Sequence, residues 1–80
     1  MKQRKLGRVQ RGVLEALREH GSWGQYHGWL WDTASGTERR LKALVKRGLA
    51  EVVPDTDPPV YRITQAGRDA LEALEQEQEA

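Results

Sequence analysis

Apolar residues recur at spacings of three and four over residues 6–20, which is the spacing of one face of an amphipathic helix. Gly21 follows this pattern, and glycine commonly ends helices. The apolar face contains Leu6, Val9, Val13, Ala16 and Leu17. The pattern therefore predicts a first helix with one buried side.

A second helical pattern covers residues 34–47 and has clearer limits. Thr33 can cap its first amides, or Ser35 can do so in a capping box with Glu38. Gly48 then ends the pattern. The predicted inward stripe consists of Thr37, Leu41, Leu44 and Val45.

The segment between these two patterns, residues 22–32, is rich in aromatic residues and glycine. The spacing of Tyr26 and Leu30 is compatible with a short helix, although Gly24 and Gly28 each cost about 1 kcal/mol inside one. It holds four of the five aromatic residues of the chain: Trp23, Tyr26, Trp29 and Trp31. Because the chain has no phenylalanine, we expect these rings mainly to build the core. An exposed ring would instead mark a protein contact or, less favoured, a platform for single-stranded nucleic acid.

After Gly48 the pattern changes from helical to extended. Residues 49–53 and 60–63 are predicted to form a β-hairpin around a turn at 54–59, and Thr64 is placed to cap a last helix from Gln65. The apolar face of that helix contains Ala66, Ala70, Leu71, Ala73 and Leu74. The order of elements predicts one α+β, mainly α domain over residues 1–80. Its expected architecture is a winged helix-turn-helix with three helices, a two-stranded β wing and a C-terminal helix.

Charge is distributed unevenly along the chain, although the net charge is only +1. Eleven basic and four acidic residues precede Gly48, a balance of +7, and two basic and eight acidic residues follow it, a balance of −6. This asymmetry suggests that the first half faces a polyanion, and the alternative is that solvated helices simply carry charge. Residues 1–5 form a basic arm that either reaches DNA or only aids solubility, and the acidic residues 76–80 are expected to fray.

One face of the second helical pattern is polar and mostly cationic. Ser35, Arg39, Lys42 and Lys46 recur at spacings of four, three and four, with arginines on the flanks. A helix fits the major groove of DNA, where Arg39 can read guanine and the lysines meet phosphates. The alternative is a solvated face with a pair between Glu38 and Lys42. The predicted DNA-binding residues are Ser35, Gly36, Thr37, Arg39, Arg40, Lys42, Lys46 and Arg62.

Two runs of sequence resemble a known family. Residues 35–49 are similar to the recognition helix of winged-helix regulators of the MarR and PadR kinds, and residues 59–68 are similar to their second wing strand and the following helix start. The resemblance implies binding to operator DNA, usually as a homodimer. It departs from the family at the wing tip, where Asp55 and Asp57 replace the basic residues that are often found there.

Several other chemistries are not predicted. The chain has no cysteine, and His20 and His27 lack partners at ligand spacing, so we expect no metal and no cofactor. Ser22 and His27 have no recognisable third group, so we expect no enzyme. There is no apolar run of membrane-spanning length and no signal-peptide pattern, which predicts a cytoplasmic protein.

The sequence thus predicts a small DNA-binding protein, a transcription regulator that places helix 34–47 in the major groove of double-stranded DNA. The alternative is a winged-helix interaction module that docks on a protein partner through residues 23–31. An RNA partner is disfavoured, because a helix cannot enter the narrow major groove of A-form RNA. A homodimer through the first or last helix is a further possibility, opposed by the acidic charge of the last helix.

Overall fold

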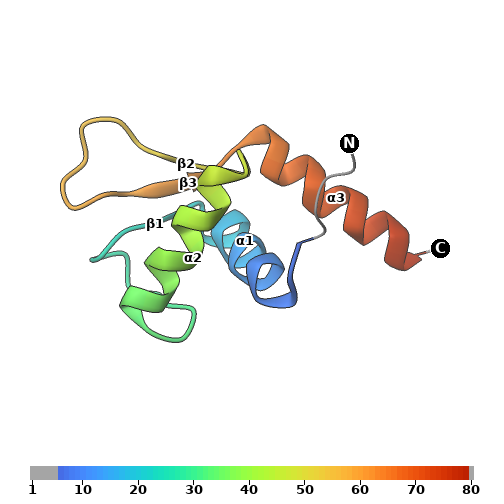
Figure 1. The fold of residues 1–80 in the computed structure, drawn as a ribbon, viewed down its shortest axis with the longest axis horizontal. Coiled ribbons are helices and arrows are strands. Elements are labelled where there is room, and N and C mark those ends of the chain that lie inside the picture. Colours follow the sequence, from blue (N-terminus) through green and yellow to red (C-terminus); the bar gives the residue numbers. More distant parts are fainter. Residues whose placement is uncertain (1–5, 80) are drawn as a thin grey trace.

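The computed structural model describes residues 6–79, which form three helices and a small sheet (Figure 1). The elements are α1 (Arg8–His20), β1 (Ser22–Trp23), α2 (Ala34–Lys46), β2 (Ala50–Val52), β3 (Tyr61–Ile63) and α3 (Gln65–Glu79). The hairpin of β2 and β3 projects from one side of the molecule, and α3 leads away on the other (Figure 1). This is a winged helix-like α+β fold, as predicted, and the predicted basic arm at residues 1–5 lies outside the described residues.

The segment from 22 to 32 differs from its prediction. It forms no helix but contains β1 followed by turns, with Gly28 at a φ of 85°. Because β1 pairs antiparallel with β3, the sheet has three strands in the order β1-β3-β2, not the two expected of the wing. In this register both Trp23 and Val52 lie opposite Tyr61, so the start of the segment is fixed to the middle strand.

The core lies where α1 meets α2, α3 and the sheet. Val13 and Leu17 are fully buried as predicted, but Leu14 is buried with them and Val9 is 38% exposed. The buried side of α1 is therefore rotated toward Leu14, because α2 and α3 both pack on it. The buried hydrophobic residues are Val13, Leu14, Leu17, Trp23, Leu41, Leu44, Leu49, Ala50, Tyr61, Ile63 and Leu71.

Threonines cap two of the helices. The Thr33 side chain accepts a hydrogen bond from the Gly36 amide at 3.0 Å, so the first of the two predicted caps of α2 is the one formed. Thr64 accepts from the Gly67 amide at 3.1 Å and donates to the Gly48 carbonyl at 2.7 Å. Thr64 therefore caps α3, as predicted, and also joins it to the turn that follows α2.

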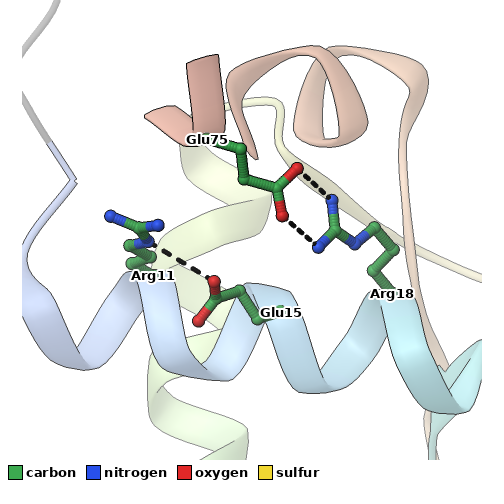
Figure 2. A network of polar contacts seen from close by, with 4 residues as sticks. All are labelled: Arg11, Glu15, Arg18 and Glu75. Atoms are coloured by element: carbon green, nitrogen blue, oxygen red, sulfur yellow. Dashed lines mark hydrogen bonds and ion pairs between the residues drawn. The ribbon is translucent and has the colours of Figure 1, made fainter. Parts of the chain in front are cut away.

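Helix α3 is joined to α1 by an apolar and a polar contact. Leu71 is fully buried, and the two nitrogens of the Arg18 guanidinium donate to the two oxygens of Glu75 at 3.1 and 2.7 Å (Figure 2). The hydrogen bonds from Arg18 lower the pKa of the Glu75 carboxyl. Along α1, Arg11 pairs with Glu15 at 3.4 Å (Figure 2).

One detail of α3 differs from the sequence prediction. Ala66 and Ala73, assigned to its apolar face, are exposed. The helix itself continues through Glu79, and the fraying expected for residues 76–80 stays a prediction. Glutamate and glutamine, which fill this last turn, are good helix formers.

Replacing Leu44 by alanine is expected to lower the free energy of unfolding by about 2–5 kcal/mol, because it leaves a cavity at a fully buried site on α2. Chemical denaturation measures this change. Lys46→Ala, on the exposed side of the same helix, is the matched control and should alter stability by less than about 0.5 kcal/mol. Equal stabilities of the two variants would contradict this packing.

Gly67→Ala is expected to destabilise the domain by about 1–3 kcal/mol, although alanine is the better helix former by about 1 kcal/mol. A Cβ at this position would collide with the backbone carbonyl of Leu49 and lie 2.7 Å from the Ile63 side chain. Thermal and chemical denaturation test this, with the exposed neighbour Arg68→Ala as control. A gain in stability for Gly67→Ala would mean that α3 does not approach Leu49 this closely.

Candidate nucleic-acid interface

The outward side of α2 is polar and cationic. Residues three and four positions apart lie on the same side of a helix, so its apolar and polar residues can gather on opposite sides. Leu41 and Leu44 are fully buried on the inner side. Ser35, Arg39, Lys42 and Lys46 are all exposed, at the spacings that the sequence analysis identified. We call these four residues the basic face of α2.

Thr37 does not belong to this face. It is fully buried, its hydroxyl accepts a hydrogen bond from the Trp31 amide at 2.9 Å, and it lies 2.6 Å from the Thr33 carbonyl, to which it donates. The prediction that Thr37 approaches DNA is therefore wrong, whereas its place in the inward stripe is confirmed. Gly36 is buried as well, with its amide used in the Thr33 cap, so it also offers no contact to DNA.

The two arginines on the flanks of α2 contact the protein itself. Arg40 donates to the Gly36 carbonyl at 3.2 Å, which holds its guanidinium along the helix. Arg47 donates to the Gln10 side chain of α1 at 2.9 Å. Both side chains are partly exposed, so each contributes positive charge beside the basic face.

The wing is poorly suited to contact the phosphates of a nucleic acid. Arg62 is the one cation in residues 50–63, and it forms an ion pair with Glu51, its register partner on β2. The tip carries Asp55 and Asp57, whose negative charge repels a polyanion. The ion pair with Glu51 therefore competes with the predicted contact between Arg62 and DNA.

A hollow of about 350 Å³ lies between the start of α2, the segment after β1 and the wing. A neighbouring hollow of about 260 Å³ lies between that segment and the wing tip, and Gln25 and Pro58 line both. The larger hollow is lined by Trp23, Gln25, Ala34, Ser35, Glu38, Pro58 and Pro59. Sequence analysis missed Gln25, since nothing in a polar residue between a glycine and a tyrosine indicates that it lies beside the helix start.

Tyr61 connects the sheet to this hollow. Its hydroxyl donates to the Glu38 carboxylate at 3.1 Å, and its ring is almost fully buried. Burial raises the pKa of Tyr61 to about 12, with a further contribution from the bond to the negatively charged Glu38. This bond connects β3 directly to α2.

Within residues 6–79 no three histidine or acidic side chains lie close enough to hold a metal ion. The Ser22 hydroxyl lies 3.2 Å from Nδ1 of His27, and no carboxylate in the described chain forms a hydrogen bond with that ring. No helix of this part of the chain is long and apolar enough to cross a bilayer.

The fold and the basic face together define a winged helix-like α+β domain with an exposed cationic helix. The chain is similar to the crystal structure of a probable transcriptional regulator from Pseudomonas aeruginosa, with a TM-score of 0.64 and 28% sequence identity. The similarity covers 85% of this chain and 55% of that one, so the chain spans little more than half the length of its neighbour. No protein-family model and no curated protein sequence matches the chain.

The raised pKa of Tyr61 predicts a loss of stability at high pH. The folded state keeps the phenol neutral up to about pH 12, whereas the unfolded state loses its proton near pH 10. The contribution is therefore fully present below pH 10 and is lost as the pH rises from about 10 to 12. Relative to Tyr61→Phe, the parent should lose roughly 2–3 kcal/mol over this range. Denaturation of both proteins at each pH measures this, and parallel curves would contradict it.

Proposed function

We propose that this domain binds double-stranded DNA through the basic face of α2 and serves in transcription regulation. The observation that carries the proposal is the separation of α2 into a fully buried side and an exposed side whose residues are three cations and a serine. A helix of this kind fits the major groove of B-form DNA.

The basic face supports a division of roles. Arg39, at its centre, is suited to bidentate hydrogen bonds with the O6 and N7 acceptors of guanine. Lys42 and Lys46 follow on the same side and are suited to phosphates, which position the helix without reading sequence. Ser35 lies in the first turn of α2, where a phosphate or a base edge would be approached. Arg40 adds a flanking charge, while Gly36, Thr37 and Arg62 receive no role.

The structural comparison supports a regulatory role. The similar crystal structure is that of a probable transcriptional regulator, and the similarity extends over most of this chain. Because it covers only 55% of that protein, the functions of the remainder are not transferred. The resemblance to MarR and PadR regulators remains a prediction made from residues 35–49 and 59–68.

Homodimer formation also remains a prediction. Leu71, the main apolar residue of α3, is fully buried within the monomer. A second copy would therefore meet Ala66 and Ala73, with the half-buried Leu74 beside them. Sedimentation equilibrium at micromolar concentration distinguishes the states, since a monomer mass with and without DNA would remove the dimer.

A protein-docking function is the second candidate. It is favoured by two apolar side chains before α2, because Leu30 is 55% exposed and Trp31, whose ring packs at Gly12, is 37% exposed. Aromatic residues are enriched at binding hot spots. Salt separates the two functions, since DNA binding weakens steeply as salt rises and an apolar contact does not.

Arg39→Glu is expected to weaken binding to a mixed-sequence duplex of about 30 base pairs by tenfold or more, since it removes a bidentate contact and adds repulsion. The midpoint of thermal unfolding should be unchanged, because the side chain is exposed. Titration at several salt concentrations should also show a smaller salt dependence than in the parent.

The matched control for this experiment is Arg68→Glu. It makes the same change of charge at an exposed position on α3. If the two variants lose affinity equally, net charge rather than the basic face determines binding. If neither loses affinity, the proposed function is wrong.

A further inference from the structure

The segment that follows β1 forms a tight turn with two exposed residues at its tip. The His27 amide donates to the Gly24 carbonyl at 3.1 Å, which closes a turn with Gln25 and Tyr26 at its two central positions. The Ser22 hydroxyl and the His27 ring form a second link, at 3.2 Å, across the same turn. Tyr26 is 81% exposed, and Gln25 is exposed as well.

The base of this turn is held by tryptophans. The indole of Trp23 donates to the Trp29 carbonyl at 2.8 Å, and the indole of Trp29 donates to the Ser22 carbonyl at 2.9 Å. His20, at the end of α1, stacks on the Trp29 ring with centroids 4.7 Å apart. The two exposed side chains are therefore presented by a pre-organised loop, which reduces the entropic cost of binding through them.

The position of the turn relates it to α2. Gln25 lines the larger hollow together with Ala34 and Ser35, the first two residues of α2. Ser35 is also the first residue of the basic face. The turn and the basic face are thus parts of one continuous surface at the start of the helix.

A helix in the major groove lies between two phosphate backbones, because the groove is only about 12 Å wide. A surface that adjoins the helix start is therefore placed beside one of these backbones. The wing, which also borders the hollow, carries acidic residues at its tip, and its cation Arg62 is paired with Glu51. Gln25 and Tyr26 offer neutral amide and hydroxyl donors, which are common partners of phosphate oxygens.

We propose that Gln25 and Tyr26 are phosphate-contacting residues that hold the DNA backbone beside the groove occupied by α2. This inference rests on the proposed DNA-binding function. The turn supplies the backbone contact for which the acidic wing tip is unsuited. Gln25 lines the larger hollow with Ser35, whereas Tyr26 lines the smaller one with Asp57. Gln25 therefore meets the backbone on the side that faces Ser35, and Tyr26, which is 81% exposed, meets it from the tip of the turn.

The test uses the full chain with the changes Gln25→Ala and Tyr26→Phe, alone and together, and a mixed-sequence duplex of about 30 base pairs. A phosphate contact carries no sequence information, so this probe is sufficient. Each change should weaken binding about tenfold, since each removes a hydrogen bond to a charged group. The dependence of affinity on salt should stay equal to that of the parent, because neutral donors neutralise no phosphate and release no counterion.

Gln76→Ala is the control for Gln25→Ala, because Gln76 is an exposed glutamine in the last part of α3. Figure 1 shows that the C-terminal end of α3 lies far from α2. It should bind DNA as the parent does, and all variants should keep the parent's melting temperature. Parent-like affinity of the double variant, with loss of binding in Arg39→Glu, would overturn this inference and leave the proposed function intact. Parent-like affinity of Arg39→Glu as well would overturn both.

Discussion

Two crossed hydrogen bonds, from the indoles of Trp23 and Trp29 to backbone carbonyls, fix the segment on which the rest of the structure depends. They close residues 22–29 into a compact unit without helical hydrogen bonds. The Trp23 ring packs against Tyr61 with centroids 6.1 Å apart, and the Tyr61 hydroxyl reaches Glu38. A continuous set of contacts therefore leads from this segment through β3 to α2, and it sets the helix relative to the wing.

Thr37 completes this arrangement from the other end of the segment. It is the one buried polar residue of the described chain, and its hydroxyl joins the Trp31 amide to the first turn of α2. A buried hydroxyl without partners costs about 1–3 kcal/mol, so these bonds make the site strongly selective for one packing of the segment. Since the inner side of α2 is anchored in this way, its outer side remains available for a partner.

The sequence predicts those elements of the fold that local sequence patterns determine. Periodicity and the caps Thr33 and Thr64 identify the helices, and the change of period after Gly48 identifies the hairpin. Strand β1 is two residues long and exists because it pairs with β3, about forty residues later, which no local pattern reports.

The same limit applies to the prediction of the site. The exposure of the basic face follows from helical spacing, whereas the pairing of Arg62 with Glu51 requires the strand register.

The basic and acidic halves of the sequence lie on different elements of the structure. Within the described residues, the cations of the first half lie on α1, on α2 and at the Arg47 cap that ends α2. The acidic residues of the second half lie on the wing and on α3, where Asp69, Glu72 and Glu77 are exposed. The electric field of this charge distribution attracts a polyanion toward α1 and α2 and repels it from the wing and α3. The pairs of Arg18 with Glu75 and of Arg62 with Glu51 neutralise cations outside the basic face. Under the proposed function, this charge distribution would orient an approaching duplex toward α2 before any base is read, and would leave recognition to the few side chains around its start.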